Sequence, residues 1–368
     1  MTLRVAYTYE TDITKATAAL KTQLKPERAK WVLYFAASRF DPQHTAAAMS
    51  KAFDGATVVG CTTAGELTSG KMLKHSIVAM LLDDDELELV AAEVATPIKD
   101  GVESVRQALG RLGQQLGKPI SKLGNTDYVG LVLTDGMSGA EEEVMATLTQ
   151  HCSIPFVGGS AGDDLKFQQT FVSLNGTAHS NATLLVILKP KHGFEILKTQ
   201  SFKAQTQTLV ATDVDEPNRT VRAFNGKPAA AEYARVLGIA QEALASAFMQ
   251  HPLGLMVDEE PFVRSPQQLK GDAVVFYCAV KKGMELRLLD GTDIVADTSQ
   301  ALAETQARGP IRGLINFHCI LRTLGLEANR QTDAYGKLFS AIPTIGFSTY
   351  GEAYIGHINQ TSTMLVLR

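Results

Sequence analysis

Short apolar runs alternate with helix-like segments near the start of the chain, and this alternation favours an α/β fold. Residues 31–37 form an apolar run, WVLYFAA, which is bounded by polar sequence and predicts a buried strand. Residues 45–53 have a helical pattern, and residues 56–60 predict a second strand. A strand, a helix and a strand in this order favour a sheet that has parallel pairs and covering helices.

The same order returns twice, so the chain contains an internal repeat. The later copies consist of a strand, a helix and a strand at residues 128–134, 139–151 and 154–158, and again at residues 313–318, 332–341 and 342–346. Each second strand leads into a turn that carries a hydroxyl group, a glycine and a carboxylate. These turns, called corners below, occupy residues 61–66, 159–163 and 347–352. Because the copies are widely spaced, they indicate duplicated α/β subdomains rather than a solenoid.

Other segments predict antiparallel hairpins and a second domain. Strand patterns that flank turn signals predict two hairpins, formed by residues 170–175 with 182–188 and by residues 273–280 with 284–289. An alanine-rich stretch predicts a long helix at residues 228–248. Loop signals between residues 190 and 225 indicate a domain boundary. We therefore expect an α/β protein with two domains, residues 1–200 and 201–368, built from mixed sheets, repeated strand–helix–strand units and antiparallel hairpins.

The corners are the first candidate site, because ligands of α/β sheets bind beyond the carboxyl ends of the strands. Glycine lets the backbone approach a ligand closely, and the hydroxyl and carboxyl groups suit a small polar molecule. The candidate ligand-binding residues of the corners are Thr62, Thr63, Glu66, Ser160, Asp163, Tyr350 and Glu352. We expect the corners to surround a common hollow. In the alternative interpretation, they are tight structural turns whose acids accept hydrogen bonds from backbone donors.

Several of these motifs resemble those of the FIST family of sensory domains. Residues 59–66 (VGCTTAGE) look like the signature of its N-terminal domain, and residues 157–164 (VGGSAGDD) are similar to its second motif. Residues 345–352 (IGFSTYGE) and 359–361 (NQT) resemble motifs of its C-terminal domain. The resemblance covers the chain from about residue 30 to 366. It implies a protein that senses small ligands in signal transduction.

One branch of that family, the NosP proteins, resembles this chain more closely at residues 317–322 (FHCILR) and 354–361 (YIGHINQT). This resemblance implies haem b, nitric oxide sensing, and regulation of a partner histidine kinase in bacterial two-component and cyclic-di-GMP signalling. Haem needs an axial ligand and an apolar pocket. Three histidines are candidate axial ligands and one arginine is a candidate partner of a haem propionate: His251, His318, His357 and Arg322.

The composition argues against other classes of protein. A net charge of −4 without a large basic cluster does not favour nucleic-acid binding. The apolar runs are shorter than the roughly 20 residues of a membrane span. We recognise no signal peptide, and the four separated cysteines are expected to be reduced thiols, which favours a cytoplasmic location. The sequence leaves the oligomeric state open, a homo-oligomer included.

We expect a receptor and not an enzyme. Residues 158–162 match the Gly-x-Ser-x-Gly pattern of serine hydrolases, whose nucleophile turn leads directly into a helix. Here strand-like sequence follows, so a hydrolase that uses Ser160 is the third hypothesis. The second hypothesis is a sensor of another small molecule, such as an amino acid.

Overall fold

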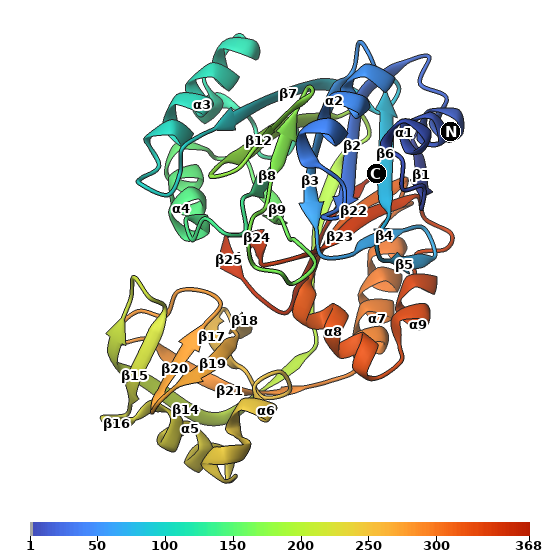
Figure 1. Ribbon diagram of the computed structural model, residues 1–368. Coiled ribbons are helices and arrows are strands. Elements are labelled where there is room, and N and C mark those ends of the chain that lie inside the picture. Colours follow the sequence, from blue (N-terminus) through green and yellow to red (C-terminus); the bar gives the residue numbers. More distant parts are fainter. Residues whose placement is uncertain (1–2) are drawn as a thin grey trace. The chain divides into compact units, whose positions relative to one another are not determined.

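The computed structural model describes residues 3–368, which divide into two compact units (Figure 1). Unit 1 comprises the chain up to Thr199, together with Thr298–His357 and Ser362–Arg368. Unit 2 comprises Gln200–Asp297 and Ile358–Thr361. The chain leaves unit 1 beside the predicted boundary at residue 200 and returns to it after Asp297. The predicted domains, residues 1–200 and 201–368, divide the sequence at one point, and they stay a prediction. The two units are defined differently, by contacts in space.

Unit 1 contains three copies of one order of elements, which confirms the predicted strand–helix–strand repeat. Copy 1 consists of β1 (Arg4–Thr8), α1 (Ile13–Leu24), β2 (Ala29–Ala37), α2 (Pro42–Ala52), β3 (Thr57–Thr63), β4 (Glu66–Thr68), β5 (Lys71–Leu73) and β6 (Ile77–Asp83). Copy 2 consists of β7 (Leu87–Ala95), α3 (Glu103–Gln115), the 3-10 helix η1 (Ile120–Lys122), β8 (Val129–Thr134), α4 (Glu141–His151), β9 (Phe156–Ser160), β10 (Val172–Leu174), β11 (Thr177–His179) and β12 (Thr183–Pro190). Copy 3 consists of β13 (Phe194–Gln200), α7 (Ile294–Ala307), β22 (Gly313–Cys319), α8 (Ile320–Ala328), α9 (Thr332–Lys337), β23 (Thr344–Thr349), β24 (Glu352–Tyr354), β25 (Gly356–Ile358) and β26 (Thr361–Leu367). Unit 2 is inserted into copy 3, between β13 and α7.

The three copies build three mixed sheets that share one strand order. The orders are β1-β6-β2-β3-β10-β11, β7-β12-β8-β9-β24-β25 and β13-β26-β22-β23-β4-β5. The central pairs β2–β3, β8–β9 and β22–β23 are parallel, as the strand–helix–strand order predicted. The last long strand of each copy, β6, β12 or β26, lies antiparallel beside that pair.

Each copy contributes its short hairpin to the sheet of another copy. In copy 1, β4 pairs with β23 of copy 3. In copy 3, β24 pairs with β9 of copy 2, and in copy 2, β10 pairs with β3 of copy 1. The exchange is cyclic, so every sheet of unit 1 is completed by residues from elsewhere in the sequence.

One hydrophobic core joins the three sheets. It contains apolar side chains from the central strands of all three copies. The rings of Phe35 and Phe347 lie 4.5 Å apart between their centres, and those of Phe317 and Phe347 lie 6.0 Å apart. The helices of copies 1 and 2 pack on the opposite faces of their sheets and form separate cores there, with α3 and α4 beside β7, β12 and β8 (Figure 1).

Three equivalent glycines allow the parallel strands to approach closely. A Cβ atom at Gly60, Gly158 or Gly346 would lie 2.5, 1.8 or 2.3 Å from the carbonyl oxygen of Tyr34, Val132 or Asn316, respectively. Real Cβ atoms essentially never come so close to a backbone atom. The glycine that follows the first residue of each motif is therefore required by packing in all three copies.

Unit 2 is an antiparallel sheet with short helices. Its elements are β14 (Phe202–Asp215), β15 (Thr220–Phe224), β16 (Lys227–Pro228), α5 (Ala229–Leu237), the 3-10 helix η2 (Gln241–Ala243), α6 (Leu244–Ala247), β17 (Leu253–Val257), β18 (Glu260–Arg264), β19 (Pro266–Lys270), β20 (Ala273–Phe276) and β21 (Glu285–Gly291). The strand order is β18-β17-β21-β14-β15-β20-β19, and β16 pairs with β15. The rings of Phe224, Tyr233 and Phe276 lie in its core.

Two predicted hairpins are wrong in their pairing. β10 forms its hairpin with β11, whereas β12, the predicted partner, pairs with β7 and β8. β20 pairs with β15 and β19, and β21 pairs with β14 and β17, so residues 273–280 and 284–289 form no hairpin. The predicted helix at residues 228–248 is broken after α5, because Gly238 adopts a φ of +72°. Apolar periodicity identifies a strand but not its partner.

The glycine contacts predict a large difference between two alanine substitutions. Gly158→Ala is expected to destabilise unit 1 by roughly 3 kcal/mol or more, because its Cβ would overlap the carbonyl of Val132. The control, Gly110→Ala in α3, places a Cβ where no heavy atom lies within 4 Å, and it is expected to stabilise by about 0.5–1 kcal/mol. Urea unfolding measures both, and similar changes in the two variants would contradict the prediction.

Candidate functional site

The three corners meet, and backbone hydrogen bonds join them in a closed ring. Equivalent residues provide the bonds, which are Gly162 N to Thr62 O at 3.0 Å, Ala64 N to Ser348 O at 3.4 Å, and Tyr350 N to Ser160 O at 3.1 Å. The bonds run from copy 2 to copy 1, from copy 1 to copy 3, and from copy 3 to copy 2. Two further bonds run in the opposite direction, from Ser348 N to Gly65 O at 2.7 Å and from Ser160 N to Gly351 O at 2.8 Å.

The corners pack against one another and enclose no hollow. A Cβ at Gly162 would lie 2.8 Å from Ala64 N, and a Cβ at Gly159 would lie 2.5 Å from the Cγ2 atom of Thr349. The expectation that the corners surround a common hollow is therefore wrong. The backbone groups that we expected to bind a ligand bind the neighbouring corners.

The carboxylates of the first and third corners hold their own turns. The hydroxyl of Thr63 donates to Glu66, whose second oxygen accepts hydrogen bonds from the backbone N (3.0 Å) and the Oγ atom (2.6 Å) of Ser76. Thr349 donates to Glu352 in the same way. Both carboxylates are buried, and burial raises the pKa of Glu66 to about 7 although three hydrogen bonds favour its charged form. These contacts support the alternative of structural turns for the two Thr–Glu pairs.

Asp163 organises the loop that follows the second corner. Its carboxylate accepts hydrogen bonds from the backbone N–H groups of residues 167–169 at 2.7–3.1 Å and from the hydroxyl of Tyr350. Burial alone would raise the pKa of Asp163, but the hydrogen bonds from Tyr350 and the backbone outweigh it and lower the pKa. The ring of Tyr350 stacks on that of Phe167 at 5.0 Å. Asp163 and Tyr350 therefore join the second and third corners.

The remaining hydroxyl groups of the corners also have partners within the chain. Thr62 Oγ1 accepts a hydrogen bond from Phe171 N at 3.0 Å. Ser160 Oγ donates to Glu141 Oε1 over 3.5 Å. Ser160 ends β9 and no helix follows it directly, so it does not occupy the strand-to-helix turn of a hydrolase nucleophile.

The three candidate haem ligands have different surroundings. His251 belongs to unit 2, is partly exposed, and its Nδ1 atom lies 2.8 Å from Asp290 Oδ1. His357 packs against the third corner, where a Cβ on Gly351 would lie 2.1 Å from its Cε1 atom. His318, near the end of β22, is wholly buried.

His318 lies in a cluster of polar side chains in copy 3, all of which are at least 98% buried. We call this cluster the His318 group; its members are Asn316, His318, Arg322, Tyr335 and Ser362. A chain of hydrogen bonds links four of them, from His318 Nδ1 to Tyr335 Oη at 3.0 Å, from Tyr335 Oη to Ser362 Oγ at 3.4 Å, and from Ser362 Oγ to Asn316 Oδ1 at 2.7 Å. Arg322 donates to Thr298 Oγ1 at 3.0 Å.

The direction of this chain determines which nitrogen of His318 carries the proton. Ser362 donates to Asn316 and Tyr335 donates to Ser362, so the oxygen of Tyr335 accepts the Nδ1–H of His318. Burial, and secondarily the positive charge of Arg322, lower the pKa of His318 well below its usual value, so the ring is neutral. The Nε2 atom of His318 and the Nδ2 atom of Asn316 are buried without a hydrogen-bond partner.

The other two copies do not have such a polar pair at these positions. Strand pairing makes Ala36 and Thr134 equivalent to His318, because they lie opposite Thr62, Ser160 and Ser348 in their sheets. By the same criterion, Tyr34 and Val132 are equivalent to Asn316. The fold therefore does not require the pair of Asn316 and His318.

The sequence pattern predicts His318 and Arg322 as site residues but does not predict Asn316, Tyr335 and Ser362. One signal was present in the sequence. Asn316 stands two residues before His318 in an otherwise apolar strand, so both side chains lie on one face. Tyr335 lies on α9 and Ser362 lies on β26, and no local pattern in the sequence predicts that they contact the strand of His318.

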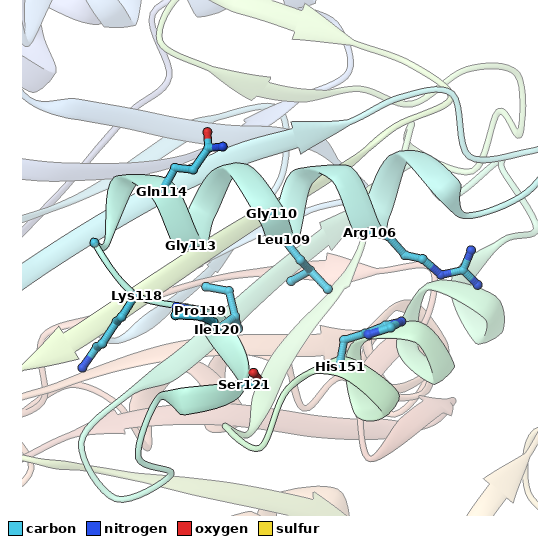
Figure 2. A pocket seen from close by; sticks show the side chains of 11 residues that line it. Arg106, Leu109, Gly110, Gly113, Gln114, Lys118, Pro119, Ile120, Ser121 and His151 are labelled. Carbon is cyan, nitrogen blue, oxygen red and sulfur yellow. The ribbon is translucent and has the colours of Figure 1, made fainter.

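The cavities of unit 1 include three that lie away from the His318 group. One has a volume of about 570 Å³ and lies between α3, the turn after it and the end of α4 (Figure 2). A second, of about 200 Å³, lies between α4 and the β24–β25 hairpin. The third has about 10 Å³ beside Tyr34 and Thr62.

Two further features are absent from residues 3–368. This part of the chain has no cluster of three or more His, Cys, Asp or Glu side chains that could hold a metal ion. None of its helices is long and apolar enough to cross a membrane.

Comparison with known proteins identifies similarity over most of the chain. The family model of the FIST N domain matches residues 30–227, and that of the FIST C domain matches residues 229–354. The chain is also 21% identical over 265 residues to the uncharacterized protein MJ1623 of Methanocaldococcus jannaschii. That alignment covers 64% of this chain and 49% of the archaeal protein, so the chain spans about half the length of this relative.

The raised pKa of Glu66 predicts a pH-dependent stability. The folded protein holds this proton more tightly than the unfolded chain, so its contribution is complete below about pH 4.5 and is lost as the pH rises through about 7. Glu66→Gln cannot ionise and is expected to reduce the fall in unfolding free energy between pH 5 and 8 by up to about 3 kcal/mol. Urea unfolding at the two pH values measures the effect. The exposed control Glu143→Gln should keep the wild-type slope, and a Glu66→Gln variant that also keeps it would refute the assignment.

Proposed function

Because the chain belongs to the FIST family, whose domains are associated with small-ligand sensing in signal transduction, we propose that this protein is a sensor whose ligand binds at the His318 group. One observation carries the proposal: His318 Nε2 and Asn316 Nδ2 are buried in the same group without hydrogen-bond partners. A buried polar atom without a partner costs about 1–3 kcal/mol of stability. The two other copies of the fold avoid this cost with different side chains.

The chemistry of the group selects a class of ligand. The neutral ring of His318 offers a lone pair at Nε2, which accepts an N–H or O–H group. The amide of Asn316 offers a donor, and Arg322 supplies a positive charge close enough to lower the pKa of His318. A small molecule that carries both a carboxylate and a hydrogen-bond donor, as an amino acid does, complements all three groups.

A route by which binding alters the protein begins at helix α8. Arg322 and Thr323 are adjacent on α8, and Thr323 Oγ1 lies 2.8 Å from the hydroxyl of Ser348 in the third corner. A ligand that moves α8 therefore acts on the ring that joins the three copies. The ligand shifts the equilibrium between two arrangements of α8 and the ring only if it binds these arrangements with different affinity.

The residues around His318 fit a haem only in part. Nε2 has the free lone pair of an axial ligand, and the bond from Nδ1 to Tyr335 has the form of the contacts that orient metal-bound histidines. A haem also needs an apolar pocket, whereas the buried cluster that contains His318 is polar, with Asn316, Arg322 and Ser362 among its members. The surroundings thus favour a polar ligand, and haem binding, nitric oxide sensing and regulation of a histidine kinase stay predictions from the resemblance.

Thermal-shift measurements with amino acids and small dicarboxylates test the proposal. A ligand present at about 100 times its Kd is expected to stabilise the wild type by about 2.7 kcal/mol, which raises Tm by several degrees. Asn316→Leu and His318→Ala should lose this response, whereas the exposed control His151→Ala should keep it. Asn316→Leu removes the unpaired Nδ2 group but also the oxygen that accepts from Ser362, so its unliganded Tm is measured first and each response is taken relative to that value.

Three results would overturn this proposal. If no compound of the panel stabilises the protein, the polar-ligand class is wrong. If added hemin gives a Soret band that His318→Ala abolishes, the ligand is haem. If a stabilising ligand acts equally on the wild type and both variants, the site lies elsewhere.

A further inference from the structure

The cavity of about 570 Å³ belongs to copy 2, and none of the residues that line it is a member of the His318 group. Its floor and walls consist of one face of α3, the turn at residues 117–121 and the end of α4 (Figure 2). The chain between the first helix and the next strand occupies residues 25–28 in copy 1 and residues 308–312 in copy 3, but residues 116–128 in copy 2. The wall of this groove is thus an addition that the common fold of the three copies does not need.

The groove combines an apolar floor with basic ends. Leu109, Pro119 and Ile120 line its interior. Arg106 and His151 lie at one end and Lys118 lies at the other (Figure 2). No carboxylate is among the residues that line the groove, and Arg106 forms an exposed ion pair with Glu103 at 2.8 Å. A ligand that bridges both ends therefore needs negative charge at two separated points.

On the groove face, packing does not require glycine at position 110. Glycine in a helix interior lowers stability relative to alanine, yet at Gly110 a Cβ would meet no heavy atom within 4 Å. Gly113 differs, because a Cβ there would lie 3.3 Å from the carbonyl oxygen of Lys118. Glycine is suited to positions where another chain approaches the backbone closely. Gly110 therefore points to an occupant that packs directly on α3.

We propose that this groove docks an acidic amphipathic helix of a partner protein. Arg106 and Gln114 are separated by eight residues of α3, which is about 12 Å along the axis, or slightly more than two helical turns. A docked helix of this length places apolar side chains over Leu109, Gly110 and Ile120. Its carboxylates meet Arg106 and His151 at one end and Lys118 at the other. A small anion would contact the basic groups of one end only.

This proposal rests on the proposed function in one respect: it takes the protein whose helix docks in the groove to be the partner that receives the signal. The groove predicts what this partner segment carries: leucine-type anchors at helical spacing between two acidic ends. Helix-in-groove recognition of this kind uses anchors at positions i, i+3 or i+4, and i+7.

A pair of synthetic peptides tests the docking surface. Each has about 15 residues and a leucine stripe, and the peptides differ only in glutamate or lysine at both ends. NMR titration of the full chain is expected to shift the backbone signals of residues 106–121 with the glutamate peptide and not with the lysine peptide. Gly110→Leu fills the groove, and Lys118→Glu reverses the charge of one end. Each is expected to weaken binding about tenfold or more.

Controls separate the failure of this inference from that of the sensor proposal. Lys51→Glu, on the exposed side of α2, changes the net charge equally and should leave peptide binding unchanged. His318→Ala should also bind the peptide normally, since it alters the other site. The docking proposal is overturned if the peptide shifts no signals, if both peptides bind alike, or if dodecanoate binds the groove and the glutamate peptide does not. Ligand binding at the His318 group would be unaffected by any of these results.

Discussion

The ring of backbone hydrogen bonds between the three corners is the constraint on which unit 1 depends. Each corner uses an N–H and a C=O group that would otherwise be buried without a partner, and such groups are seldom left unpaired in folded proteins. At Gly162 the ring leaves no room for a side chain, because a Cβ there would lie 2.8 Å from Ala64 N. The glycine that recurs at Gly60, Gly158 and Gly346 thus reflects the close approach of the two parallel strands within each copy.

Copy 3 departs from the other copies in two ways. It carries unit 2 as an insertion between β13 and α7, and it has a buried polar group on a sheet face where copies 1 and 2 have Tyr34 with Ala36 and Val132 with Thr134. Copy 2 has its own addition, the turn that builds the groove beside α3. The shared framework is therefore stabilised by what the copies have in common, and the candidate sites lie where a copy differs.

Much of the fold could be predicted from the sequence, because buried parallel strands are continuous apolar runs. Residues 31–37 and 313–318 correspond to β2 and β22 within two residues. The repeat was visible because the same corner follows each parallel pair. The partners of β12, β20 and β21 could not be predicted, since pairing depends on contacts far apart in the sequence.

We expected the corners to bind a ligand because they carry hydroxyl groups, glycines and acids. The same groups also form internal hydrogen bonds, and the sequence does not distinguish the two uses. His318 was one of three candidates, and its buried partners on α9 and β26 distinguish it from His251 and His357.

The cyclic exchange of hairpins also affects how the chain emerges from the ribosome. Strand β4, at Glu66–Thr68, forms a hairpin with β5, but the partner of its other edge is β23 at Thr344–Thr349, so this edge stays unpaired until nearly the whole chain has been synthesised. At about 5–20 residues per second, this delay is roughly 15–55 seconds. During that time the nascent protein exposes a strand edge that can pair with other chains. Molecular chaperones that bind such edges would then have their longest contact with the first third of this sequence.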